Sequence, residues 1–282
     1  MTINTGGAKM RKRIVDLLLF CLLAIGAIVI ALPFFYAIST SLKQNYQVFS
    51  IPMRWIPDPV VWENYVVPFQ QRPIARYFLN SALVSSTITF LNVITCTMAG
   101  YSFAKFNYIG RDGMFLAVLA TLMVPVQVIV IPLFVLVKSL GWLNSYAGLI
   151  VPSATSAFGI FLMRQYFQTI PSELMEAARI DGCGEWRIFR QIILPLVKPA
   201  ISALVIFIFM HNWNNFLWPL LVITQDSMMT LPLGIASFES TYSTNYPHLM
   251  AVSLASTAPV LLVFLVLQKQ FIQGMALSGL KQ

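Results

Sequence analysis

Long stretches without a formal charge alternate with short polar segments along the chain. Six such stretches occur, at residues 17–38, 80–104, 113–137, 146–163, 199–225 and 249–268. A bilayer core of about 30 Å is crossed by about 20 apolar residues of helix, and each stretch is near or above that length. Backbone polar groups in hydrocarbon must be paired within their own helix. The pattern predicts an all-α integral membrane protein with six transmembrane helices.

These runs also set the expected domain organisation. The first run is longer than the hydrophobic region of a signal peptide, so we expect it to remain as the first helix. We expect an N-terminal arm at 1–13, one transmembrane domain at 14–268, and a tail at 269–282. The loop at 39–79 contains prolines throughout, which favours short helical pieces over one long helix. The loop at 226–248 has no Lys or Arg.

Composition excludes a soluble domain. The chain is 58% hydrophobic and 10% charged, with a mean hydropathy of +0.76, whereas a soluble domain has about 25% charged residues. Basic residues concentrate on one face of the predicted topology, which by the positive-inside rule is the cytoplasmic face. This bias places both termini in the cytoplasm and explains the net charge of +8 without nucleic-acid binding. The 13 basic residues on that face are Lys9, Arg11, Lys12, Arg13, Lys105, Arg111, Arg164, Arg179, Arg187, Arg190, Lys198, Lys269 and Lys281.

The loop at 164–198 is the most highly charged segment between two predicted spans. Its pattern predicts two short helices that are separated at Gly182, a residue suited to the position after a helix end. Trp186, Phe189 and Ile193 share one stripe of the second helix, which we expect to stop near Pro195. Periodicity alone leaves two interpretations open: a helix pair lying on the lipid headgroups, or a docking surface for another protein.

A motif in this loop favours the docking surface. Glu176-Ala177-Ala178 is followed after three residues by Gly182, and after nine more by Ile192, one residue, and Leu194-Pro195. The stretch resembles the Glu-Ala-Ala loop of ABC importer permeases at every position of the family pattern, and it lies between the fourth and fifth predicted spans as in that family.

The resemblance implies an ABC importer permease fold in the cytoplasmic (inner) membrane. The loop would be the coupling helix that seats in an ATPase subunit. Its contact residues would be Glu176, Ala177, Ala178, Asp181, Gly182, Leu194 and Pro195. The implied partners are a second homologous permease, two ATP-binding subunits, an extracytoplasmic solute-binding protein and membrane lipid. The chain itself would be non-catalytic and bind no cofactor, with ATP and Mg used by the partner subunits.

Further segments are similar to the sugar-importer branch, in particular to the second permease of maltose-type systems. They are residues 123–125, 131–133, 213–220, 231–234 and 271–275. The likeness implies import of a sugar, oligosaccharide or polyol, while another solute such as glycerol phosphate stays open as an alternative.

Polar residues inside the predicted spans are candidates for a substrate path, since such groups usually face protein or a water-filled cavity. His211, Asn215 and Trp218 are spaced to share one helix face. They suit a carbohydrate passage, in which amides bond hydroxyls and an indole stacks on a sugar ring. They suit slightly better an interhelical hydrogen-bond network that holds a permease dimer together. The remaining candidates are Asn214, Asn92 and Gln127. For Asn92, within the stripe Ser85, Thr89, Asn92 and Cys96, and for Gln127, packing is the favoured role.

Two other classes of protein fit the sequence less well. A stand-alone secondary transporter generally needs ionisable residues at membrane depth and an internal repeat, and the sequence shows neither. An intramembrane enzyme would need a catalytic motif, but no His-Glu-x-x-His, Gly-x-Ser-x-Gly or phosphate-binding loop occurs. The three cysteines, Cys21, Cys96 and Cys183, lie too far apart in sequence to suggest a metal site.

Overall fold

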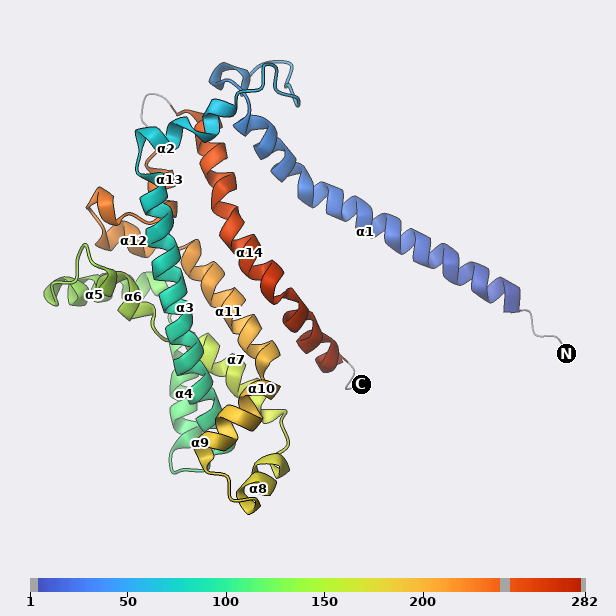
Figure 1. The fold of residues 1–282 in the computed structure, drawn as a ribbon, viewed down its shortest axis with the longest axis vertical. Helices are drawn as coiled ribbons and strands as arrows, with labels where there is room; N and C mark the ends of the chain where they lie inside the picture. The colour runs from blue at the N-terminus through green and yellow to red at the C-terminus, as the bar shows by residue number, and fades with distance from the viewer. Residues whose placement is uncertain (1–4, 239–243, 280–282) are drawn as a thin grey trace. The chain divides into compact units, whose positions relative to one another are not determined.

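The computed structural model describes residues 5–238 and 244–279, and within these ranges it contains helices and turns but no strand. Contacts divide the chain into two compact units: Met1–Arg72 with Phe238–Ala255, and Pro73–Ser237 with Ser256–Gln282. The long final helix α14 (Tyr246–Gly279) begins in the first unit and ends in the second. The predicted arm at 1–13 and tail at 269–282 lie partly outside the described residues. Figure 1 shows the helices in chain order.

The first unit consists of α1 (Thr5–Ser41) and a segment of short helices. The most apolar stretch of α1 has no buried residue. After it come η1 (Asn45–Gln47), η2 (Trp62–Tyr65) and α2 (Val67–Gln71), the short helical pieces expected from the prolines. The Asn64 amide donates to the backbone oxygens of Ser41 and Lys43 at 2.9 and 2.8 Å and thereby fixes this segment. Burial lowers the pKa of Lys43.

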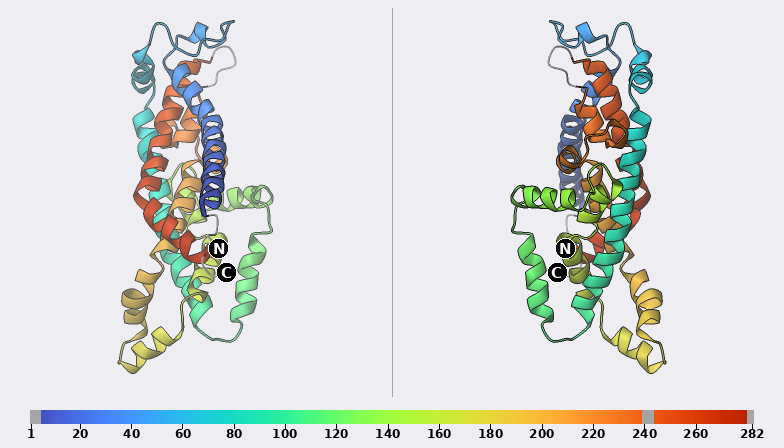
Figure 2. Two further views of the ribbon diagram at one scale, coloured as in Figure 1. Left: turned by 90° about the vertical axis from the view of Figure 1, so that its right-hand side faces the viewer. Right: turned by 90° about the vertical axis from the view of Figure 1, so that its left-hand side faces the viewer.

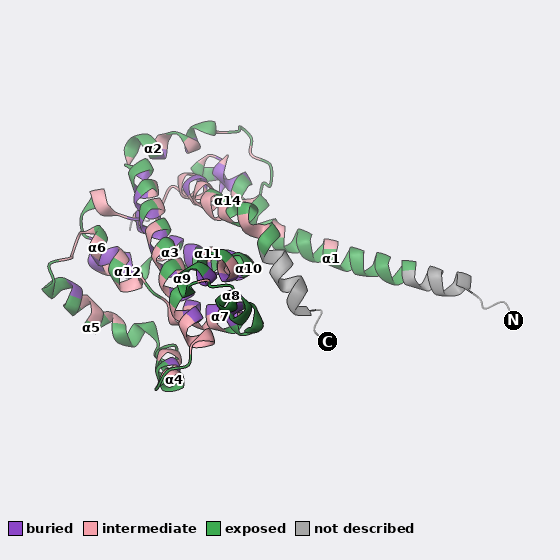
Figure 3. Cartoon of the chain, turned by 60° about the horizontal axis from the view of Figure 1, so that its bottom comes forward, coloured by how far each residue is buried: buried purple, intermediate pink, exposed green. Residues whose placement is uncertain are grey.

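The core of the second unit is formed by three helices that lie side by side, α3 (Ile74–Lys105), α7 (Ala157–Gln168) and α11 (Lys198–Trp213) (Figure 1). Glycine permits their close approach. A Cβ atom on Gly159 of α7 would lie 2.7 Å from the Cys96 Sγ atom and 2.9 Å from a Leu204 methyl carbon. Figure 3 shows buried residues concentrated on these three helices.

The third predicted span is not one straight helix. It is divided into α4 (Arg111–Thr121) and α5 (Val126–Ser139), whose axes differ by 96° (Figure 2). The cause is Pro125, which has no N–H to donate to the Thr121 carbonyl and whose ring collides with that carbonyl in a continuous helix. The apolar run at 113–137 is therefore divided between two helices.

The fourth predicted span contains a gap between α6 (Tyr146–Ile150) with η3 (Val151–Ser153) and α7. Side chains of α3 satisfy the carbonyl oxygens that this gap exposes. Asn92 donates to Ser153 O at 2.7 Å, Thr95 to Ala154 O at 3.3 Å, and the Cys96 thiol to Ser156 O at 3.4 Å. Two members of the polar stripe of α3, Asn92 and Cys96, thus bond backbone oxygens of a neighbouring segment.

Within the described residues, four helical segments are long and apolar enough to cross a membrane, and the total reaches six if each of two bent pairs is one span. The pairs are α4 with α5, and residues 185–196 with α11. This total agrees with the six apolar runs of the sequence.

Candidate functional site

The fifth predicted span ends sooner than its apolar run suggests. Helix α11 stops at Trp213, and α12 (Leu217–Val222) follows after a short irregular segment. Pro219 cannot donate to the Asn215 carbonyl. In addition, the Asn214 amide donates to Met210 O at 2.9 Å, and the Asn215 Oδ1 atom accepts from the Trp218 N–H at 3.3 Å. Such local side-chain bonds compete with helix formation. The prediction that His211, Asn215 and Trp218 share one face of a continuous helix is wrong.

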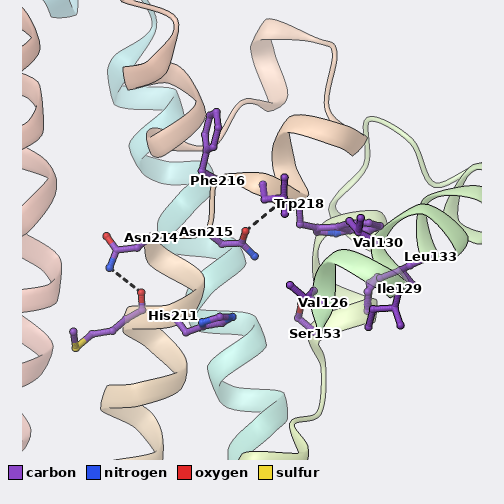
Figure 4. A pocket seen from close by; sticks show the side chains of 13 residues that line it. Val126, Ile129, Val130, Leu133, Ser153, His211, Asn214, Asn215, Phe216 and Trp218 are labelled. Carbon is purple, nitrogen blue, oxygen red and sulfur yellow. Dashed lines mark hydrogen bonds between the residues drawn. The ribbon is translucent and has the colours of Figure 1, made fainter. Parts of the chain in front are cut away.

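The same interruption opens a cavity of about 650 Å³ beside α5 and η3. Figure 4 shows the side chains around it, with His211 and Asn215 on one side and residues of α5 on the other. The lining residues are Val126, Ile129, Val130, Leu133, Pro152, Ser153, Met210, His211, Asn214, Asn215, Phe216, Leu217 and Trp218. Four of the six path candidates, His211, Asn214, Asn215 and Trp218, therefore meet at one cavity, although by a different geometry from the one expected.

Several polar groups of this cavity keep unused hydrogen-bonding capacity. The structure gives the His211 ring no hydrogen bond to any described residue, and His211 is exposed. The Asn215 amide group uses only its oxygen, and the Asn214 amide group only its nitrogen. These groups can donate and accept simultaneously, which is what recognition of hydroxyl groups requires.

Trp218 has a structural role at the cavity wall. Its indole Nε1 donates to Gly148 O at 2.9 Å, and the side chain is 8% exposed. Gly148 O lacks a helical donor because the residue four positions later is Pro152. The indole N–H therefore supplies the hydrogen bond that Gly148 O of α6 would otherwise lack, and it is not free to bind a solute.

The other two path candidates lie outside the cavity lining. Asn92 is 1% exposed and donates to Ile88 O and Ser153 O. Gln127 is exposed beside the lining residue Val126. Sequence reasoning missed Ser153 and the apolar residues of α5. Pro125, Pro132 and Pro152 were the available signal, because prolines inside apolar runs indicate that the helices there are interrupted.

The loop at 164–198 forms a hairpin at one end of the second unit (Figure 2). It contains α8 (Glu173–Ile180), α9 (Glu185–Arg187), the π-helical η4 (Ile188–Ile193) and α10 (Leu194–Leu196). The turn between α8 and α9 depends on Gly182, whose φ of +79° is one that other residues rarely adopt. Both expected helices and the role of Gly182 are confirmed.

The residues of the loop motif differ in exposure. Glu176, Ala177, Asp181 and Gly182 are exposed, and Glu176 has no ion pair with any described residue. Ala178 is 5% exposed and packs inside the chain's own core, so of the two alanines only Ala177 presents a small surface outward. At the other end of the motif, Leu194 is half-buried and Pro195 is exposed.

An ion pair joins the two arms of the hairpin. Arg179 of α8 donates to both carboxylate oxygens of Glu185, at 2.6 and 3.2 Å. The hydrogen bond to Glu185 raises the pKa of Arg179. Glu176 lies three residues before Arg179 on the same helix, but the ion pair of Arg179 is with Glu185. The carboxylate of Glu176 is thereby left available.

The π-helical segment follows from Pro195. A proline here cannot donate to Gln191 O, and the Leu194 N–H bonds Phe189 O, five residues back, in place of the usual four. The wider turn rotates Phe189 and Ile193 inward, where they are 6% and 0% exposed. Trp186 remains 64% exposed, so the expected stripe is buried at only two of its three positions.

Known proteins match this chain along most of its length. The profile of the family described as "Binding-protein-dependent transport system inner membrane component" matches residues 96–276. The arabinooligosaccharides transport system permease protein AraQ of Bacillus subtilis (strain 168) is 38% identical over 252 residues, which cover 88% of this chain and 90% of that protein. The sn-glycerol-3-phosphate transport system permease protein UgpE of Yersinia pestis is 35% identical over 272 residues, covering 94% and 97%.

The fold also matches a solved structure. A chain of a bacterial ABC transporter involved in the import of the acidic polysaccharide alginate superposes with a TM-score of 0.81, at 22% identity, over 93% of this chain and 98% of that one. At this identity the match shows the fold, and it confirms the expected all-α permease fold. Taken with the profile match, it shows that the chain belongs to the family of inner membrane components of binding-protein-dependent transport systems.

Proposed function

We propose that this chain is the permease subunit of an ATP-driven importer for a neutral sugar, oligosaccharide or polyol. A solute-binding protein delivers the solute from outside, and a second permease completes the path. Two ATPase subunits supply the energy. The observation that carries the proposal is the complete coupling motif on an exposed helical hairpin, with Glu176 unpaired among the described residues and Gly182 at the turn.

The cavity supports a neutral solute. None of its lining residues is Asp, Glu, Lys or Arg, and its polar groups are two amides, an imidazole and a hydroxyl. Sugar hydroxyls both donate and accept hydrogen bonds, so they match such groups, while the apolar residues of α5 suit the C–H faces of a ring. The similarity to AraQ, named for arabinooligosaccharides, favours the same class.

Glycerol phosphate is the alternative, because UgpE is named for it. A phosphate ester carries a charge that strong sites match with Arg, Lys or several backbone N–H groups. The cavity lining offers no such cation, which favours the neutral solute.

Coupling to the ATPase would use the exposed part of the hairpin. Glu176 would meet a basic group of the ATPase, while Ala177 allows close approach and Asp181 with Gly182 forms the tip. Ala178 and Leu194 would act from within, by holding the hairpin against the spans, while Pro195 would shape the π-helical segment. ATP and Mg would be bound by the partners and not by this chain.

The charge bias supports an orientation with both termini and the 164–198 hairpin in the cytoplasm. In this orientation the loops at 39–79 and 226–248 face outward and would meet the solute-binding protein. ATP-driven closure of the ATPases would then shift the spans between inward-open and outward-open states, through the partner's different affinity for the two states.

The test is to purify the tagged chain from its native membrane with its partners and to measure uptake in proteoliposomes. Each assay contains ATP and the co-purified binding protein, with radiolabelled arabino-oligosaccharides, other sugars, polyols or sn-glycerol 3-phosphate as the solute. We expect ATP-dependent uptake of a neutral carbohydrate. Uptake of only the phosphate ester would overturn the solute assignment, and ATP-independent uptake by the chain alone would overturn the importer assignment.

A further inference from the structure

Tyr101 of α3 packs against the coupling hairpin. It lies in the last turns of α3 and is 6% exposed. Its hydroxyl donates to the Met175 Sδ atom of α8 at 3.9 Å. Its ring lies 4.9 Å from the ring of Phe189 in η4 and 5.4 Å from that of Phe167 in α7, measured between centroids. One side chain thus contacts the coupling helix, the π-helical segment and a core helix.

Helix α8 has few other attachments to the spans. Its buried residues are Met175 and Ala178, and Met175 is the one that bonds Tyr101. The exposed Arg179–Glu185 ion pair also joins α8 to α9. The Tyr101 side chain therefore lies on a contact route from the hairpin to α3.

On the other side of Tyr101, the helices α3 and α7 are packed tightly together. Lys105 at the end of α3 donates to Ile170 O at 2.5 Å, and Arg164 of α7 donates to Phe103 O at 3.3 Å. Gly100 brings α3 and α7 so close that a Cβ atom on it would lie 2.6 Å from the Met163 Cβ atom. The Arg164 bond and the Gly100 contact hold α3 to α7, which makes the pair a single block for any force applied at Tyr101, while the Lys105 bond ties the end of α3 to the segment between α7 and α8.

Between the hairpin and α3, in contrast, there is space into which the hairpin can move. A groove of about 230 Å³ lies beside Tyr101 and is lined by Met98, Ser102, Phe106, Glu185, Trp186 and Phe189. The covalent route from the hairpin into α11 is also bent, by 76° between residues 185–196 and α11.

We propose that Tyr101 is the positioning residue that transmits movement of the coupling hairpin to α3 and thereby to the spans. The proposal rests on the proposed function, since it requires α8 to be the part that the ATPase moves. Tyr101 does not touch solute or nucleotide and acts through Met175 and Phe189. Its loss uncouples ATP hydrolysis from transport and leaves the complex assembled.

The experiment uses the assembled transporter in proteoliposomes, with wild type, Tyr101→Ala, Tyr101→Leu and Tyr101→Phe. Leucine keeps apolar volume without a ring, and phenylalanine keeps the ring without the hydroxyl. The matched control is Phe209→Ala, which removes a 7% exposed ring stacked on Trp213 in α11, away from the hairpin. The measured quantities are co-purified ATPase, the ATPase rate with and without solute-loaded binding protein, and uptake.

For Tyr101→Ala and Tyr101→Leu, we expect normal amounts of ATPase in the complex but at least about a tenfold loss of stimulation and uptake, a typical size for coupling between sites. Tyr101→Phe retains most of the stimulation because the ring contacts remain. The proposal is overturned if Tyr101→Leu is stimulated like wild type, or if Phe209→Ala loses stimulation equally. Absence of ATPase from the wild-type complex refutes the proposed function itself, a result distinct from both.

Discussion

The coupling hairpin and the membrane cavity are built in opposite ways. The hairpin comes from one continuous segment, 164–198, and its motif residues Glu176, Ala177, Asp181 and Gly182 are exposed. The cavity is assembled from α5, η3, the end of α11 and the start of α12, which lie far apart in sequence. One continuous segment of sequence can form a surface for a protein partner. This cavity, in contrast, requires interruptions in several helices that lie next to one another in space.

The polar interactions of the two regions differ as well. The Arg179–Glu185 pair is exposed, with 42% and 47% of the two side chains accessible to solvent. The bond from Trp218 to Gly148 O is buried. Exposed ion pairs contribute little to stability, while a buried carbonyl left without a donor is costly. Changes to exposed hairpin groups should therefore have little effect on stability, and changes at the cavity should affect stability or transport.

The largest effect should follow Glu176→Lys, which reverses the unpaired charge of the hairpin. Loss of one member of an interfacial charge pair costs about 2–5 kcal/mol, so we expect at least about a thirtyfold weaker association with the ATPase. The measurement is the amount of ATPase that co-purifies with the tagged chain. The matched control is Glu173→Lys, in the same helix but outside the motif, and an equal loss in that control would refute a specific role of Glu176.

Trp218→Phe tests the buried bond at the cavity wall. It leaves Gly148 O without a donor, and we expect the free energy of unfolding to fall by about 1–3 kcal/mol. Thermal unfolding in detergent, with Trp186→Phe as the exposed control, measures the difference. If Trp218→Phe unfolds at the wild-type temperature and loses only uptake, then the indole serves the solute and not the backbone of α6.

Asn215→Leu tests the unused hydrogen-bonding capacity of the cavity. Removal of one hydrogen bond to a solute hydroxyl costs about 0.5–1.5 kcal/mol, which corresponds to up to about tenfold in uptake. The co-purified ATPase should stay at the wild-type level. Asn212→Leu is the control, because Asn212 is absent from the cavity lining and bonds Ile208 O of its own helix. Equal uptake by both variants would remove Asn215 from the path.

Arg179→Gln should have the smallest effect. The Arg179–Glu185 pair is exposed, and such pairs contribute little to stability, so we expect a melting temperature close to that of wild type. ATPase co-purification should also stay near normal, because Glu176 and Gly182 remain in place. A loss as large as that of Glu176→Lys would show that the motif depends on this ion pair, and would move the coupling contact toward α9.

Sequence alone predicted those features that depend on local chemistry. The apolar runs indicated six spans because their length must match the bilayer. The coupling motif could be recognised because its residues lie within one short segment. The turn at Gly182 could be predicted because only glycine readily adopts its φ of +79°. The packing role of the α3 stripe could be favoured, since buried polar groups need partners.

Only the tertiary structure decided which polar residues face the cavity. Asn92 and Asn215 look alike in sequence. Asn92, however, donates to Ser153 O beside the gap between α6 and α7, whereas Asn215 lies in the irregular segment between α11 and α12 and lines the cavity. For Trp218 the sequence left sugar stacking and interhelical hydrogen bonding open, and the structure shows its N–H bonded to Gly148 O, which Pro152 leaves without a helical donor. Ala178 was expected outside and is buried. For Asn92 and Trp218 the physical reason is that a polar side chain's role depends on which backbone groups its neighbours leave unpaired, and for Ala178 it is apolar packing; in each case the neighbours are distant in sequence.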